Sequence, residues 1–165
     1  SPSDWILRVT ADNPLTDPNL TKMLIEQAKN INKSQDLISD SIGKRNFPLG
    51  LIPYIIRTSA LLSLRKKISS REKFHLTHVT SKVSKTKHAK FKNFDKKHSK
   101  FGGARLTLDK FEDYLTISSL VDKLGKNWIN CNINKIIKVL NANPKILSYN
   151  QHIFQKNLSL RTIKC

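Results

Sequence analysis

Charge is distributed very unevenly along this chain, and that distribution limits what the chain can fold into. Residues 44–105 carry a net charge of +15, whereas residues 1–43 carry −2 and residues 106–165 carry +5. Lys, Ser, Thr and His dominate residues 68–105, and few aliphatic side chains remain there, so this stretch can bury little apolar surface. We therefore predict that residues 68–105 form an extended or partly disordered basic arm between two folded units.

The first of these units, residues 1–67, begins with a helical pattern. Asp17 followed by Pro18 is typical of a helix start, because the carboxylate caps free backbone N–H groups and proline needs none in the first turn. The apolar residues that follow recur at helical spacing and share one face: Leu20, Leu24, Ala28 and Ile31. We expect an amphipathic helix here.

Two further helices are expected in the same unit. A short one would start at Ser34 and carry apolar residues up to Gly43, which supplies a left-handed stop. The other would run from about Ile52 to Lys67 and be the most buried element, because it is apolar on nearly all sides.

The last unit, residues 106–165, also shows short helical patterns. We expect one helix capped by Thr107 and another that starts at Ser118 or Ser119 and stops at Gly125. A further helix would begin at Asn132 or Asn134 and end before Pro144, with a basic tail after it. The predicted fold class is therefore mainly α, with small helical units at both ends joined by an extended basic segment.

The basic arm indicates contact with a polyanion, most plausibly RNA. Lysine outnumbers arginine 23 to 7, which favours contact with phosphates over reading of base edges. Phenylalanines interleaved with the lysines are able to stack on unpaired bases. The predicted nucleic-acid-binding residues are Arg65, Lys66, Lys67, Arg71, Lys73, Lys82, Lys85, Lys87, Lys90, Phe91, Lys92, Phe94, Lys96, Lys97, Lys100, Phe101 and Arg105. The alternative is a solvated linker whose phenylalanines pack back onto the core.

These patterns lead us to predict a structural RNA-binding protein, a component of a ribosome or another large ribonucleoprotein. Its partners would be RNA, such as rRNA, and neighbouring proteins, with no small-molecule substrate. The abundance of Lys, Ile and Asn, which have A/T-rich codons, favours a mitochondrion or another organelle over a cytoplasmic ribonucleoprotein. A membrane partner is not expected, because the longest apolar stretch, Phe47 to Leu64, is interrupted by Pro, Gly and Arg.

The sequence shows no motif that requires a cofactor, a metal or catalysis, so we predict a non-enzymatic protein. Asp109 and Asp113 are four apart and able to hold Mg²⁺ together, but acids in a first helical turn also stabilise a helix. The histidines, which include a His-x-x-His pair, have no cysteine near enough in sequence to complete a zinc site: His75, His78, His88 and His98. Cys131 and Cys165 are expected to be free thiols.

Three other functions fit the same features. A viral matrix or nucleocapsid protein would combine helices with a basic surface that binds RNA or an anionic membrane. A helical DNA-binding module is possible within residues 107–143, although arginine is scarce there. An RNA-processing enzyme would show magnesium-dependent turnover that the Asp109→Ala substitution abolishes.

Overall fold

The structure is a computed structural model in which residues 4–40, 45–67, 87–92 and 96–153 are described. The elements in chain order are β1 (Trp5–Arg8), α1 (Pro18–Lys29), β2 (Leu37–Ser39), β3 (Tyr54–Arg57), α2 (Thr58–Lys67), β4 (His88–Lys90), the 3-10 helix η3 (Lys96–Phe101), α4 (Phe111–Leu124), η4 (Trp128–Asn130), α5 (Ile133–Ala142) and η5 (Pro144–Tyr149).

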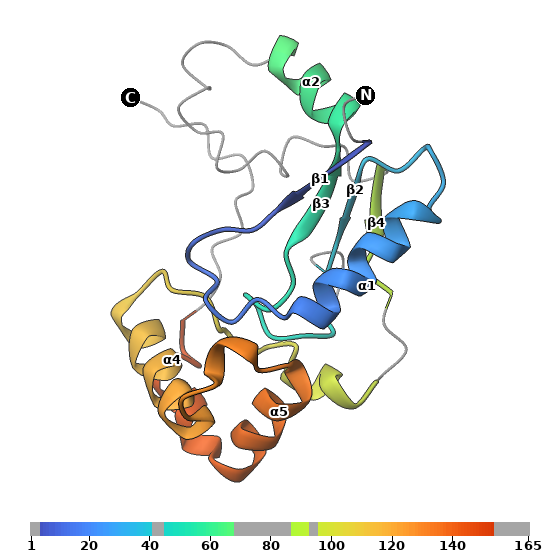
Figure 1. Ribbon diagram of the computed structural model, residues 1–165. Helices are drawn as coiled ribbons and strands as arrows, with labels where there is room; N and C mark the ends of the chain where they lie inside the picture. Colours follow the sequence, from blue (N-terminus) through green and yellow to red (C-terminus); the bar gives the residue numbers. More distant parts are fainter. Residues whose placement is uncertain (1–3, 41–44, 68–86, 93–95, 154–165) are drawn as a thin grey trace, which may run out of the picture.

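The four strands form one mixed sheet in the order β1-β3-β2-β4 (Figure 1). Strand β3 runs antiparallel to both of its neighbours, with Ile56 opposite Ile6 on β1 and opposite Leu37 on β2. Strand β4 pairs in parallel with β2, and Ala89 lies opposite Ile38. Strands β1, β2 and β4 therefore run in the same direction, and their carboxyl ends meet at one edge of the sheet.

Helices cover both faces of this sheet. Helix α1 lies across the front face in Figure 1 and turns its buried side, which includes Leu20 and Leu24, toward Ile38 and Ile55 of the sheet. On the other face, Leu37 and Ile56 pack with Leu61 and Leu64 of α2. The buried side chains of β2 and β3 alternate between the two faces, since successive side chains of a strand point to opposite faces of its sheet.

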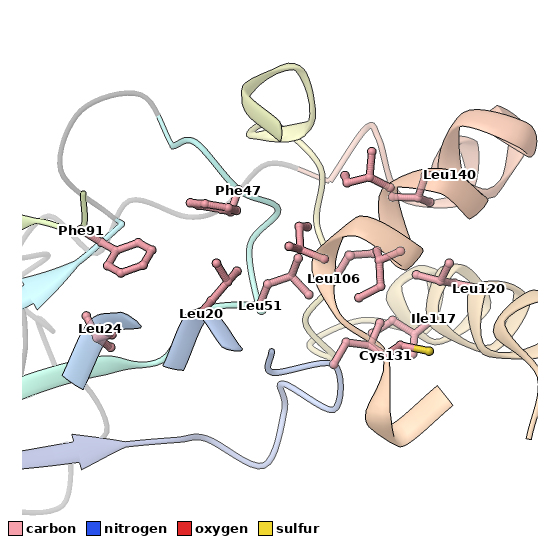
Figure 2. Close-up of a cluster of buried hydrophobic side chains, with 14 of the residues drawn as sticks. Leu20, Leu24, Phe47, Leu51, Phe91, Leu106, Ile117, Leu120, Cys131 and Leu140 are labelled. Atoms are coloured by element: carbon pink, nitrogen blue, oxygen red, sulfur yellow. The ribbon is translucent and has the colours of Figure 1, made fainter. Parts of the chain in front are cut away.

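The remaining helices, α4 and α5 with the 3-10 turns beside them, pack together beyond the carboxyl edge of the sheet (Figure 1). One continuous core joins them to the sheet. Figure 2 shows it running from Phe91 and Leu24 beside the sheet, through Leu51 and Leu106, to Leu120 and further residues of α4 and α5. The five named here are each completely or almost completely buried.

The prediction of a mainly α fold with an extended basic joining segment is wrong. The chain is α/β, and the segment predicted as a helix from Ser34 contains β2. All three residues of β2 are buried. A short, fully buried strand reads as a continuous apolar run, and its periodicity does not separate it from a piece of buried helix.

The helix predicted from Ile52 to Lys67 is two elements. Residues 54–57 form the central strand β3, and the helix α2 starts only at Thr58. The β-branched pair Ile55 and Ile56 is a signal for a strand that the sequence did contain. Both side chains are buried on opposite faces of the sheet, which explains why this stretch looked apolar on all sides.

Other boundaries were predicted correctly. The Asp17 carboxylate caps α1 and Pro18 is its first residue. Asn132 caps α5, its side chain accepting a hydrogen bond from the Lys135 N–H. The two helices expected around residues 107–125 are one helix, α4, which begins at Phe111, so the expected cap at Thr107 was wrong. Gly125 with a φ of 76° ends this helix as predicted. Within the described ranges, no helix has both the length and the apolar character needed to cross a membrane.

Candidate active site at the carboxyl edge of the sheet

The carboxyl edge of the sheet is where an α/β fold usually binds its ligand. Three loops meet there: the segment after β1, the segment before β3, and residues 104–108 before α4. Backbone hydrogen bonds join the second and third, from the Leu49 N–H to the Ala104 oxygen at 2.9 Å and from the Leu106 N–H to the Leu49 oxygen at 2.8 Å. The edge is thus built from backbone segments distant in sequence.

Gly50 allows these segments to approach closely. Its φ of +99° is strained for residues with a side chain. A Cβ atom at this position would lie 2.4 Å from the Leu106 carbonyl oxygen and 3.1 Å from the Asn13 side-chain oxygen. A larger residue would therefore push apart the three segments that form the edge.

Asp12, in the loop after β1, has a buried oxygen without a hydrogen-bond partner in the described ranges. Among the described residues, nothing donates a hydrogen bond to its Oδ1 atom, although that atom is out of contact with solvent. Its backbone oxygen accepts hydrogen bonds from the Leu108 N–H at 2.8 Å and the Thr107 hydroxyl at 3.2 Å. A buried carboxylate oxygen without a donor is costly, so such an atom is a reason to look for a ligand.

Asp109 brings a second carboxylate to the same place. It follows Leu108, whose N–H is bonded to Asp12, and it precedes the first residue of α4. Its Oδ2 atom pairs with the Arg105 guanidinium, yet 42% of its side chain is exposed. Asp12 and Asp109 are thus carboxylates on two adjoining backbone segments at the carboxyl edge, one of them lacking a partner and the other partly open to solvent.

Asp113 has a different environment, although the sequence suggested pairing it with Asp109. Its carboxylate is completely buried and accepts hydrogen bonds from Arg105, from Asn150 at 2.9 Å, and from the backbone N–H groups of Asp109 and Lys110 at 3.0 Å each. The Arg105 guanidinium donates to both of its oxygens, at 2.8 Å from Nε and 3.0 Å from Nη2. Each oxygen of the Asp113 carboxylate therefore has donors within the protein, and this carboxylate stabilises the fold by linking residues 105–110 to α4 and Asn150.

This network perturbs both ionisable partners. Burial by itself would raise the pKa of Asp113, but the hydrogen bonds from Arg105 and Asn150 and the charge of Arg105 outweigh burial and lower it. Burial by itself would lower the pKa of Arg105, and its bonds to Asp113 and Asp109 reverse that direction. Both groups are held in their charged forms.

Arg105 and Phe91 were predicted to bind nucleic acid, and the structure places both in the interior. Arg105 is 6% exposed and makes the ion pairs just described. Phe91 is 0% exposed and packs against Phe47, with ring centroids 6.0 Å apart. Neither side chain is open to a nucleic acid; Phe91 follows the alternative in which the phenylalanines pack back onto the core. Phe101 is partly buried against the same core.

Side-chain contacts within the protein are described for Lys87, Lys90 and Lys100 of the predicted arm. Lys87 pairs with Asp36 at 3.1 Å and Lys90 pairs with Asp40 at 3.1 Å. The Lys100 ammonium donates to the Asn141 side-chain oxygen at 2.6 Å. Lys92 has an exposed side chain, and its backbone N–H donates to Gln27.

The other predicted nucleic-acid contacts are not placed at the level of side chains. Arg65, Lys66 and Lys67 belong to the last turn of α2, and Lys96 and Lys97 belong to η3. The remaining predicted residues lie outside the described ranges: Arg71, Lys73, Lys82, Lys85 and Phe94. Of the four histidines considered for zinc, His98 is buried with its Nε2 atom 3.1 Å from the Asn134 side-chain oxygen. In the described part of the chain, no three His, Cys, Asp or Glu side chains gather as a metal site.

Known proteins resemble this chain over nearly its whole length. It is 31% identical over 159 residues to the uncharacterized protein MJ1063 of Methanocaldococcus jannaschii and 29% identical over 141 residues to the spore coat polysaccharide biosynthesis protein SpsF of Bacillus subtilis. These matches cover 93% and 84% of this chain, and the chain spans only 60% and 55% of the length of the two relatives. No protein-family model matches it.

A solved structure shares the fold. A cytidylyltransferase from Leptospira borgpetersenii aligns with a TM-score of 0.71 and 25% sequence identity, covering 92% of this chain and 61% of that protein. The architecture is therefore an α/β, nucleotidyltransferase-like fold. These likenesses overturn the prediction of a non-enzymatic, structural RNA-binding protein of a ribosome without a small-molecule substrate. The basic composition did not reveal this, and three lysines of the predicted arm, Lys87, Lys90 and Lys100, make side-chain contacts with other groups of the protein.

Proposed function

We propose that this chain is part of a nucleotidyltransferase that acts in nucleotide-sugar synthesis, with CTP as the nucleotide donor. The observation that carries the proposal is the Oδ1 atom of Asp12, which is buried without a hydrogen-bond partner among the described residues, on a backbone segment bonded to Leu108, the residue before Asp109. Support comes from the cytidylyltransferase of the same fold and from a relative in polysaccharide biosynthesis. The chain spans 61% of the length of that cytidylyltransferase and 55% of that relative, so the activity of the whole protein is part of the proposal.

Asp12 and Asp109 would hold the divalent cation that nucleotidyl transfer needs. Mg²⁺ is commonly bound through one or two carboxylates together with substrate phosphates, so a cluster of three protein ligands is not required. The donor set fits, since one oxygen of Asp12 has no other partner in the described structure and Asp109 is partly exposed. A cation held by these two carboxylates would offset the negative charge of the nucleotide phosphates and of the leaving group.

In the proposed reaction an oxygen of the acceptor attacks the α-phosphorus of CTP. The bond from that phosphorus to the oxygen shared with the β-phosphate breaks, pyrophosphate leaves, and the acceptor's proton passes to solvent. The protein's own contribution is to position the reactants. Gly50 allows its backbone to approach that of Leu106 at the carboxyl edge of the sheet. The buried Arg105–Asp113 ion pair holds the segment that carries Asp109 in place.

Metal and nucleotide binding can be measured directly on the full chain. Mn²⁺ added with CTP is expected to broaden the amide resonances of Asp12, Asn13 and Asp109, because a paramagnetic ion relaxes nearby nuclei. The substitutions Asp12→Asn and Asp109→Asn should each weaken metal-dependent CTP binding by at least about tenfold, since each removes a charged ligand. Isothermal titration with Mg²⁺ and CTP provides the affinities.

Asp122→Asn is a matched control, because Asp122 is an exposed acid of α4 away from the edge. It should bind Mg²⁺ and CTP as the natural protein does. Broadening centred on Asp122 or on the basic surface, with residues 12 and 109 unaffected, would contradict the proposed site. A chain that binds no CTP at millimolar Mg²⁺ would contradict the proposed function.

A further inference from the structure

A hollow lies in the helical part of the molecule, away from the carboxyl edge. It has a volume of about 450 Å³ and is bordered by α4 and by the turn from α5 into η5. Ser119 and Lys123 line it from α4, and they lie eight and twelve residues after Phe111, the first residue of that helix. The hollow therefore begins roughly 12 Å along α4 from the end that follows Asp109.

Four polar groups border this hollow without a described partner in the protein. They are the hydroxyls of Ser119 and Tyr149 and the ammonium groups of Lys123 and Lys145. No hydrogen bond or ion pair is found for any of these side-chain groups within the described ranges. All four can donate hydrogen bonds, and the two lysines add positive charge, so the border suits an anion.

Apart from Asn143, the rest of the hollow is lined by apolar residues. Ala142, Pro144 and the buried Ile146 contribute aliphatic surface between the polar groups. Small-molecule sites typically combine such a surface with a few polar groups, in volumes of about 300–1,000 Å³. A ligand with an apolar body and one oxyanion would use both parts.

We propose that this hollow between α4 and η5 binds a small molecule that carries a phosphate or carboxylate on an apolar body, with Lys123, Lys145, Ser119 and Tyr149 around the oxyanion. The site is distinct from the edge that holds Asp12 and does not depend on the proposed transferase activity.

Three probes that share a phenyl ring separate the contribution of the oxyanion to binding from that of the ring. Phenyl phosphate and benzoate carry the two oxyanions, and phenol has the ring without the permanent charge. In ¹H–¹⁵N titrations of the full chain, we expect at least one of the anions to shift the amide resonances of residues 119, 123, 145 and 149, and phenol to bind at least about tenfold more weakly. The anion that binds more tightly shows whether the site prefers phosphate or carboxylate.

Variants test whether the lysines of the hollow are responsible. The double substitution Lys123→Gln with Lys145→Gln should weaken anion binding about tenfold, and Tyr149→Phe should weaken it less. Lys135→Gln with Lys138→Gln removes the same charge from exposed positions of α5 outside the hollow and should leave binding unchanged. Equal losses in the two double variants, equal binding of phenol and the anions, or no shifts with either anion would each overturn the proposal.

Discussion

Two carboxylates near the same edge of the sheet, Asp113 and Asp12, have opposite surroundings. Asp113 is completely buried and receives donors from Arg105, Asn150 and two backbone N–H groups. Asp12 has a buried oxygen that receives none from the described residues. The difference teaches that a buried acid whose hydrogen bonds are complete stabilises the fold, whereas an incomplete one indicates where a ligand can bind.

The largest expected effect follows from removing the complete carboxylate. Asp113→Ala should lower the free energy of unfolding by about 3–5 kcal/mol, because it removes the buried carboxylate that pairs with the buried Arg105 guanidinium. Urea unfolding measures the change. Asp122→Ala on the exposed side of α4 is the control and should change it by less than about 0.5 kcal/mol. Equal stability of the two variants would show that the buried network contributes little.

A second test concerns Asp17, another fully satisfied acid. Its Oδ1 atom accepts from the N–H groups of Asn19 and Leu20, and its Oδ2 atom accepts from the Ile133 N–H at 2.5 Å, so it caps α1 and also holds the start of α5. Asp17→Ala should lower the free energy of unfolding by about 2 kcal/mol or slightly more, because it removes the cap of α1 and a buried acceptor for the first N–H group of α5. Thermal and urea unfolding measure this change. A decrease in the unfolding free energy below about 0.5 kcal/mol would contradict a role of Asp17 at the starts of both α1 and α5.

The pH dependence of stability should differ between the natural protein and an Asp113→Asn variant. The pKa of Asp113 is lowered in the folded state, so its stabilisation is fully present above the unfolded value of about 3.9 and is lost as pH falls through the lower folded pKa. The difference in unfolding free energy between the two proteins should shrink from pH 5 toward pH 2.5. A difference that stays constant over this range would mean that Asp113 is not held charged by its partners.

The smallest effect on stability is expected at Asp12. Asp12→Asn should change the unfolding free energy by less than about 1 kcal/mol or even stabilise the protein, because it removes a charge whose Oδ1 atom has no described donor. The same variant should lose metal-dependent CTP binding. A strongly destabilised Asp12→Asn protein would remove the contrast with Asp113 and favour a structural role for both acids.

Local signals in the sequence were sufficient for several elements. The Asp17–Pro18 start, the Asn132 cap and the Gly125 stop each act within a few residues of themselves, so the ends of α1, α4 and α5 were visible without tertiary information. The strands were not, because β2 and β3 are buried on both faces and their apolar runs lack the alternation that marks a half-exposed strand.

The candidate site depended on contacts that the sequence does not display. Asp12 and Asp109 are 97 positions apart, and hydrogen bonds from Leu108 and Thr107 to the Asp12 backbone oxygen bring their segments together. Asp109 and Asp113 looked like a pair from their spacing, but α4 begins after Asp109, so the two carboxylates have different partners. Arg105 resembled a solvent-facing member of a basic run, and its burial against Asp113 became visible only in the fold.

The sequence by itself determined the excess of positive charge and the helix ends, because both depend on residue identity and near neighbours. Tertiary structure decided the sheet, the interior places of Phe91 and Arg105, and the unpartnered oxygen of Asp12. These depend on which distant segments supply donors and cover apolar surface. Whether a charged side chain forms an ion pair, contributes to a binding surface or binds a metal depends on the groups that the fold places beside it.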